Sequence, residues 1–226
     1  MIRALLLDAL GTLVELEPPA PYLKQALEGI SERDAERAIA AEMSYYRAHL
    51  QEGRDAQSLA ALRRRCAEAL RVALPDPARP ADLDELVAVL LGSLHFRAFP
   101  DASDALQAAR ARGLRLVVVS NWDCSLPDVL DRIGLAPLLD GVLASASAGA
   151  RKPESAIFQR AISLVGVAPS EAIHVGDSLV EDVEGARGAG IEPILLRRDG
   201  GKPPPGVTTI ASLAEIESLT LTFAGR

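Results

Sequence analysis

The chain has 226 residues, of which 49% are hydrophobic and 24% charged, a composition typical of a globular protein with a sizeable buried core. Its formal net charge of −7 argues against a general affinity for nucleic acid or for an anionic membrane surface. Two cysteines far apart, Cys66 and Cys124, favour a reducing cytoplasm over a disulfide framework. Asp8 interrupts the first apolar run too early for a signal peptide or a membrane span, so we expect a cytoplasmic protein.

The first predicted element is a buried strand at residues 2–7. The pattern of residues 17–95 predicts successive helices and no strand. We expect these helices at 22–30, 32–53, 55–74 and 81–94. A helical block of this size exceeds an ordinary crossover between two strands. It therefore predicts a separate, all-helical, lid-like domain, joined by linkers near 15–19 and 96–100 to a second domain formed by residues 1–16 and 96–226.

One segment of the helical block carries a cluster of aromatic and basic side chains. Helical spacing puts Tyr45 or Tyr46 on the same face as His49, with Arg47 close by. Packing against neighbouring helices is the simpler interpretation of this cluster, and contact with a substrate is the alternative.

The rest of the chain alternates strands with helices. Apolar runs typical of buried parallel strands occur at 114–120, 172–177 and 191–197, with a weaker one at 141–145. Amphipathic segments at 101–113, 125–134, 153–166 and 179–190 each end in a glycine, a common helix stop. This order predicts an α/β fold with a doubly wound, mainly parallel, Rossmann-like sheet. We take residues 200–206 (GGKPPPG) for a stiff surface loop.

Polar and charged residues gather where the predicted strands end, which is where open parallel sheets bind their ligands. They are Asp8 and Thr12 after the first strand, Ser120 and Asn121 after the second, Asp177 and Asp182 after the strand at 172–177, and Lys152 just before a helix. Each alone has an ordinary interpretation as a turn, a helix cap or a solvated loop residue. Their coincidence at one edge of one sheet favours a binding or catalytic site. His174, inside the strand at 172–177, is interpreted as a core histidine.

These residues and their neighbours resemble the four motifs, in order, of the haloacid dehalogenase-like (HAD) hydrolase superfamily. The matching segments are residues 8–13 (DALGTL), Ser120-Asn121, Lys152-Pro153, and residues 176–178 (GDS) followed by Asp182. The resemblance covers essentially the whole chain and implies that residues 17–95 are the family's helical cap, inserted between the first and second motifs. It also implies that Asp8 is the nucleophile and that Mg²⁺ is held by the carboxylates of Asp8 and Asp177 and by the backbone carbonyl of Leu10.

The resemblance assigns roles to the remaining motif residues as well. Ser120 and Lys152 would bind the oxygens of the transferring group, and Asp182 would hold Lys152 or the metal-bound waters in place. We expect Thr12 and Asn121 to bind the substrate, a small phosphorylated metabolite. Physical chemistry independently supports a cation here, because two carboxylates about 4 Å apart repel by about 4 kcal/mol at an effective dielectric constant of about 20.

Leu10 departs from the pattern of the family's phosphatases, which usually carry an aspartate there as general acid. Losing a general acid costs on the order of 10² to 10⁴ in rate. One reading is therefore a Mg²⁺-dependent phosphatase that is slow on alkyl phosphates but adequate on acyl or aryl phosphates. A second is a protein that binds a phosphorylated ligand or a partner with little catalysis.

A third reading is a 2-haloacid dehalogenase, because that branch of the family also lacks the second aspartate. The dehalogenases use no metal, and they carry asparagine where this chain has Asp177 and tyrosine where it has Phe158. A phosphonate-cleaving enzyme would need Lys24, the only lysine of the helical block, as a Schiff-base lysine, and nothing around Lys24 matches.

Overall fold

The computed structural model describes residues 1–76, 79–80 and 82–216. It divides into two compact units, which we call the core unit (Met1–Glu15 with Ala98–Arg226) and the helical unit (Leu16–Arg97). These limits differ by one and two residues from the boundaries expected at 16/17 and 95/96. The assignment of the helical unit as a cap stays a prediction.

Six parallel strands form the sheet of the core unit. They are β1 (Ala4–Leu7), β4 (Arg115–Ser120), β5 (Gly141–Ala144), β6 (Ala172–Gly176), β7 (Glu192–Leu196) and β8 (Thr208–Ile210), in the spatial order β5-β4-β1-β6-β7-β8. The five predicted strands are confirmed, and β8 is a sixth that sequence analysis missed. Leu7, the last residue of β1, lies between Val118 of β4 and Val175 of β6. Asp8 therefore leaves the sheet near the middle of its carboxyl edge.

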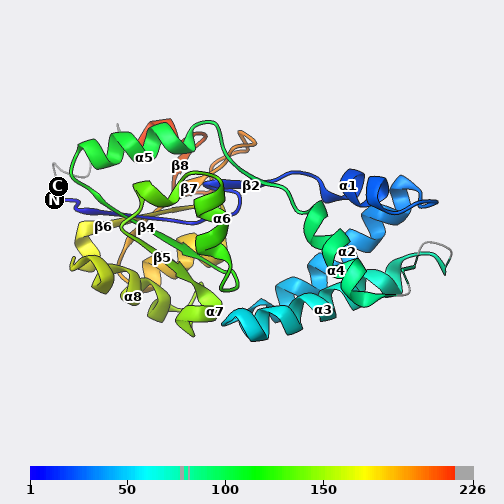
Figure 1. Ribbon diagram of the computed structural model, residues 1–226. Helices are drawn as coiled ribbons and strands as arrows, with labels where there is room; N and C mark the ends of the chain where they lie inside the picture. The colour runs from blue at the N-terminus through cyan, green and yellow to red at the C-terminus, as the bar shows by residue number, and fades with distance from the viewer. Residues whose placement is uncertain (77–78, 81, 217–226) are drawn as a thin grey trace. The chain divides into compact units, whose positions relative to one another are not determined.

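Helices cover both faces of this sheet, so the predicted α/β, Rossmann-like fold is confirmed. The helix α5 (Ala102–Ala111) lies on one side of the strands and α8 (Ser155–Val165) lies on the other (Figure 1). On the α8 side, Leu6 of β1 and Val117 of β4 pack against Ile157 and Phe158. Because both faces are covered, β1 is buried at every position, and this explains its unbroken apolar run.

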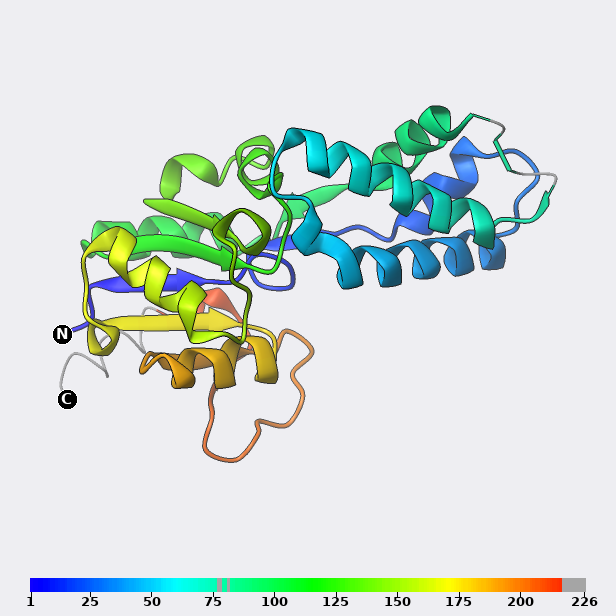
Figure 2. The ribbon, with the colours of Figure 1, turned by 90° about the horizontal axis from the view of Figure 1, so that it is seen from below.

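Three further segments of the core unit lie near its sheet. The helix α6 (Leu126–Arg132) and the short α7 (Ser145–Ala148) flank β5; the former was predicted and the latter was not. The connection between β7 and β8 contains the expected loop at 200–206, drawn in orange, which extends away from the sheet (Figure 2).

The helix expected at 179–190 is irregular in the structure. A wide, π-helical turn at Leu179–Glu184 precedes a short α9 (Gly185–Gly188). Within the turn, the Asp182 carboxylate bends back to accept a hydrogen bond from the backbone N–H of Ser178 at 3.0 Å. Gly185 packs against α8, where a Cβ atom would lie 2.8 Å from the ring of Phe158. Inserted turns of this kind are frequent at functional sites.

The helical unit consists of α1 (Pro19–Ala26), α2 (Glu32–His49), α3 (Ala56–Ala73) and α4 (Leu83–Ser93). In both views α2 and α3 run side by side (Figures 1 and 2). The side chains of Ser31, Asp55 and Asp82 cap the N-termini of α2, α3 and α4 by accepting backbone N–H groups. Ala81, the first residue of the helix expected at 81–94, lies outside the described residues. The described residues between 20 and 90 contribute no strand to the six-stranded sheet.

The expected linkers are more ordered than predicted. β2 (Val14–Leu16) pairs with β3 (Phe96–Ala98) in a separate two-stranded sheet, and the N–H of Glu17 donates to the carbonyl of His95 at 2.9 Å. α1 begins at Pro19, earlier than expected, because proline is well tolerated in the first turn of a helix. Across the described part of the chain, we find no helix with the length and apolar character needed to cross a membrane.

The aromatic cluster of α2 packs locally. The rings of Tyr45 and His49 stack with centroids 4.0 Å apart, and His49 Nδ1 lies 2.8 Å from the carbonyl of Tyr45. Tyr46 is half-buried, whereas Arg47 is exposed. The stacking within one turn of helix accords with the packing interpretation.

Candidate active site

Asp8 is held in a fixed orientation at the end of β1. Its backbone N–H donates to the carbonyl of Val175 at 2.9 Å, and the residue is only 6% exposed. Asp8 Oδ1 accepts hydrogen bonds from Ser120 Oγ at 2.9 Å and from Lys152 Nζ at 2.6 Å. Among the described residues, every recorded hydrogen bond to this carboxylate falls on Oδ1, which leaves Oδ2 to a substrate or an ion.

Lys152 lies between two carboxylates in the interior of the core unit. Its Nζ is 2.6 Å from Asp8 Oδ1 and 2.5 Å from Asp182 Oδ1, and the side chain is 1% exposed. Burial alone would lower the pKa of Lys152, but the charges of Asp8 and Asp182 outweigh burial and hold the pKa above its ordinary value. The lysine is therefore a permanent cation beside Asp8.

The two carboxylates respond to this environment in opposite directions. Burial raises the pKa of Asp8, although Lys152 opposes that effect. Burial also acts to raise the pKa of Asp182, but Lys152 and a hydrogen bond from His174 more than offset it, and the pKa lies well below its usual range. The structure thus favours an ionised Asp182 that anchors Lys152.

Asn121 fixes the backbone of Lys152. Its Nδ2 donates to the carbonyl of Lys152 at 3.0 Å, and its Oδ1 accepts from the N–H of Lys152 at 2.9 Å. Both ends of the amide are therefore engaged in positioning the lysine. The expectation that Asn121 binds the substrate stays a prediction, as does the expected contact of Ser120 with the transferring group.

Asp177 completes an acidic cluster with Asp8 and Asp182. Side-chain oxygens of the three residues all lie within 4.8 Å of one another, and Asp177 is the exposed member. Partial removal of its carboxylate from water, and then the negative charges of Asp8 and Asp182, raise the pKa of Asp177 to about 7. The cluster holds three carboxylates against a single lysine, so full ionisation leaves two negative charges uncompensated.

This donor set fits a small divalent cation. Carboxylate oxygens are the ligands that Mg²⁺ prefers, and one divalent ion would balance the excess charge. Gly11, at a φ of +86°, supplies the space, because a Cβ atom there would lie 2.2 Å from Asp177 Oδ2. The expectation that Asp8, Asp177 and the carbonyl of Leu10 hold Mg²⁺ stays a prediction.

Leu10 directly precedes Gly11, the residue that borders the carboxylate of Asp177. Leu10 is 37% exposed and follows Asp8 by two positions. Next to it, a cavity of about 410 Å³ is lined by Gly11, Asp177, Leu179 and Arg197, among others. The wall of this cavity therefore combines the carboxylates of Asp177 and Asp199 with two arginines and three leucines.

The loop after Asp8 is tied to distant parts of the core unit through Arg198, which sequence analysis did not single out. Arg198 Nη2 donates to the carbonyl of Thr12 at 2.8 Å, and the guanidinium pairs with both oxygens of Asp101 at 3.0 and 2.9 Å. The Thr12 side chain is fully buried, and its Oγ1 has no hydrogen-bond partner in the described part of the chain. Its expected contact with substrate stays a prediction.

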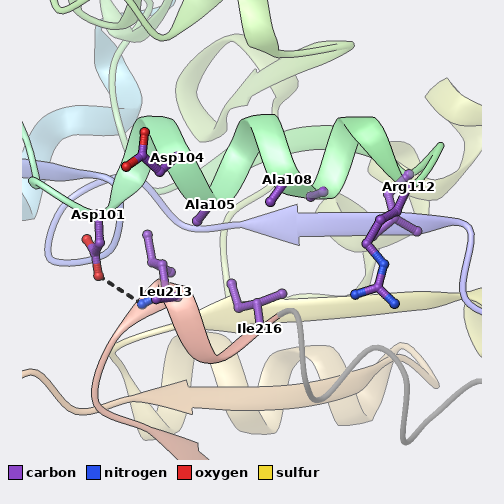
Figure 3. A pocket seen from close by; sticks show the side chains of 10 residues that line it. Asp101, Asp104, Ala105, Ala108, Arg112, Leu213 and Ile216 are labelled. Carbon is purple, nitrogen blue, oxygen red and sulfur yellow. Dashed lines mark hydrogen bonds between the residues drawn. The ribbon is translucent and has the colours of Figure 1, made fainter.

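A second hollow, of about 230 Å³, lies beside α5 (Figure 3). Its lining includes Ala105 and Ala108 of α5 and Leu213 and Ile216 from the end of the described chain. Asp101 at its margin is already engaged, since it accepts a hydrogen bond from the N–H of Leu213 at 2.9 Å and pairs with Arg198. None of the predicted site residues lines this hollow.

Comparison with known proteins gives one consistent family. A family model described as haloacid dehalogenase-like hydrolase matches residues 2–190. The haloacid dehalogenase-like hydrolase domain-containing protein 3 of Bos taurus is 43% identical over 95 residues, which are 42% of this chain and 38% of that protein. The phosphoserine phosphatase of Thermus thermophilus is 37% identical over 135 residues, which are 58% of this chain and 52% of that protein. The chain thus matches about half or less of the length of these relatives.

Solved structures match over nearly the whole chain. A HAD phosphatase from Thermococcus onnurineus has a TM-score of 0.68 and 26% identity, and the match covers 97% of this chain and 98% of that one. A 2-haloacid dehalogenase from Pseudomonas syringae pv. Tomato DC3000 has a TM-score of 0.69 and 24% identity, with 99% and 100% covered. At that identity the second likeness shows the fold alone.

Proposed function

Because this chain belongs to the haloacid dehalogenase-like hydrolase family, we propose that it is a cytoplasmic, Mg²⁺-dependent phosphatase that acts through Asp8 on a small phosphorylated metabolite. The observation that carries the proposal is the buried pair of Asp8 and Lys152, with Asp177 facing it across the acidic cluster. A phosphatase among the curated relatives and another among the solved structures support it. In this proposal the helical unit is the cap, and the β2–β3 pair is its hinge.

The proposed reaction has two displacements at phosphorus. An oxygen of Asp8 attacks the phosphorus atom, the bond to the leaving oxygen breaks, and an aspartyl phosphate forms. Water then attacks the same phosphorus, the bond to Asp8 breaks, and inorganic phosphate leaves with the carboxylate restored. Ser120 and Lys152 donate to oxygens of the transferring group, and Asp182 holds Lys152 in place. When bound, Mg²⁺ supplies positive charge that offsets the charge of the phosphoryl oxygens.

Leu10 determines which leaving groups the proposed site handles well. An alkoxide needs a proton as it departs, and leucine has none to give, so water must supply it. Carboxylate and phenolate leaving groups depart without that proton. We therefore infer a preference for acyl or aryl phosphates over alkyl phosphates, of the order of 10²-fold or more.

The absence of a side-chain acid at position 10 also favours the second candidate, a protein that binds a phosphorylated ligand or a partner and turns it over poorly. The dehalogenase reading has less support. Asp177 supplies a carboxyl group where the metal-free dehalogenases have asparagine, and Phe158 is buried against His174 and has no hydroxyl group.

The deciding experiment assays the purified protein with and without Mg²⁺ on p-nitrophenyl phosphate, acetyl phosphate, glycerol 1-phosphate and 2-chloropropionate. We expect Mg²⁺-dependent turnover of the first two and much slower turnover of the third. Asp8→Asn should abolish turnover, and Asp177→Asn should abolish its dependence on Mg²⁺ together with calorimetric Mg²⁺ binding. Chloride release without metal would overturn the proposal in favour of a dehalogenase. Tight binding of a phosphate ester without turnover would favour the binding protein.

A further inference from the structure

Two positions on one face of β6, His174 and Gly176, lie against the carboxylate of Asp182. His174 and Gly176 stand two residues apart on the strand, so their side-chain directions coincide. His174 Nε2 lies 2.8 Å from Asp182 Oδ1. At Gly176, a Cβ atom would lie 2.1 Å from Asp182 Cγ, so only glycine leaves room for the carboxylate. His174 thus contacts the carboxylate of Asp182, and Gly176 leaves the space that the carboxylate occupies.

The contact assigns the tautomer of His174. A carboxylate that is ionised only accepts hydrogen bonds, so Nε2 carries the hydrogen and donates it. The histidine is completely buried, and its Nδ1 has no hydrogen-bond partner within the described residues. Its ring meets the ring of Phe158 edge to face, with centroids 5.0 Å apart and an interplanar angle of 86°. The one recorded polar contact of the imidazole is thus with Asp182.

We propose that His174 is a positioning residue that acts through Asp182 on Lys152. Asp182 Oδ1 accepts from both His174 Nε2 and Lys152 Nζ, while Oδ2 accepts from the N–H of Ser178 at 3.0 Å. These three donors fix the carboxylate, and the carboxylate fixes the Nζ atom that contacts Asp8. His174 is therefore more than a core histidine, because it determines where the cation beside Asp8 stands.

Amide hydrogen exchange of Ser178 reads the position of Asp182 without any need for activity. We expect His174→Leu, which keeps an apolar side chain in the space, to accelerate exchange of the Ser178 amide by about tenfold, because the carboxylate that accepts it loses a fixed donor. The Ser125 amide is the internal control. It donates to a different aspartate, Asp123 Oδ1, at 2.8 Å in another loop of the core unit, and its exchange should not change.

Two further variants separate positioning from packing. His174→Gln keeps an N–H donor at similar reach and should return Ser178 exchange to within about threefold of the parent. Phe158→Leu loosens the packing around the His174 ring but leaves the contact with Asp182, so its Ser178 amide should also exchange at nearly the parental rate. Equal acceleration in His174→Leu and His174→Gln, or in Phe158→Leu, would overturn the proposal, since packing alone would then explain it.

A measurement on the unmodified protein covers the case in which His174→Leu does not fold. Long-range ¹H–¹⁵N NMR correlation should show His174 as the Nε2–H tautomer, and an Nδ1–H tautomer would refute the donation to Asp182. The catalytic consequence rests on the proposed function: His174→Leu should lower kcat by about tenfold or more with KM within about twofold, and His174→Gln should recover most of it. If the exchange pattern holds but no variant hydrolyses a phosphate, the positioning role stands and the proposed function falls.

Discussion

Replacing Gly11 with alanine tests whether the close approach of Asp177 serves metal binding. Gly11 has a φ of +86°, and an added Cβ atom would lie 2.2 Å from Asp177 Oδ2 and 2.7 Å from Asp177 Cγ. The shorter distance is about 1.2 Å below the 3.4 Å at which ordinary van der Waals contact begins. Because the obstructing atoms are the end of a side chain, we expect the carboxylate to move by about that amount while the fold is kept.

The substitution should change two quantities, the free energy of unfolding and the Kd for Mg²⁺, which are measured separately. The left-handed backbone at position 11 should cost alanine about 1–2 kcal/mol in the free energy of unfolding. Mg²⁺ requires near-ideal octahedral geometry with metal–oxygen distances of about 2.0–2.1 Å. A carboxylate oxygen displaced by about 1 Å therefore no longer coordinates the ion. We expect the Kd for Mg²⁺ to rise between about tenfold and 100-fold, as when groups that orient metal ligands are removed.

Gly113→Ala is the matched control, because Gly113 has a φ of +79° and nothing within 4 Å of its added Cβ atom. Urea unfolding should show a similar loss of stability in both variants. Titration calorimetry should show weaker Mg²⁺ binding in Gly11→Ala only. If Gly11→Ala binds Mg²⁺ as tightly as Gly113→Ala does, the metal does not use the Asp177 position seen here, and the reasoning fails.

Three other outcomes follow from the same geometry. Leu10→Asp should raise the hydrolysis of alkyl phosphates by up to about 10² to 10⁴ while aryl phosphates gain much less, and Asp8→Asn in the same background should abolish both activities in a colorimetric phosphate assay. Without metal, the pKa of Asp177 is about 7 when folded against an ordinary value of 3.8, so the folded protein holds a proton that the unfolded chain releases. The stability that the Asp177 carboxyl contributes is present below about pH 4 and is lost as the pH rises through 7. The Tm of the metal-free parent should fall over this range, and the Tm of Asp177→Asn should lack that pH dependence. Asn121→Ala leaves the N–H and carbonyl of Lys152 without their partner and should lower the free energy of unfolding by about 1–3 kcal/mol in urea.

The parts of the fold that the sequence predicts are those whose signal is local. The central strands are mostly apolar because helices cover both faces of the sheet, and the run at 114–120 can be recognised without knowledge of its neighbours. β8 has only three residues, and its Thr-Thr-Ile segment is too short for any periodicity. β2 and β3 are equally short and exist because they pair with each other across about 80 residues of sequence, which no local pattern reveals.

The candidate site divides in the same way. Asp8, Ser120 and Asp182 could be placed together because they lie at or after strand ends, and the topology brings those ends to one edge. Lys152 was added because it lies just before a helix. Tertiary side-chain contacts that depend on an irregular backbone could not be predicted from the sequence. Asp182 contacts Lys152 because the helix expected at 179–190 opens into a wide turn. The same turn brings the Asp182 carboxylate against Gly176 and His174, so the roles of these two residues could not be predicted from the sequence.

In the proposed reaction, Leu10 affects only the departure of the leaving group, because leucine adds no charge near Asp8. The donors to Asp8, Ser120 and Lys152, come from other elements, and leucine adds no charge to the cluster. An aspartate introduced at position 10 would be a fourth carboxylate beside this cluster, in which mutual repulsion already helps to raise the pKa of Asp177 to about 7. Like charges favour the protonated form, which is the form that a general acid needs. The gain of Leu10→Asp on alkyl phosphates should therefore be largest near neutral pH and fall as the pH rises further. If the gain instead grows steadily with pH, the introduced carboxylate acts as a base and donates no proton to the leaving group.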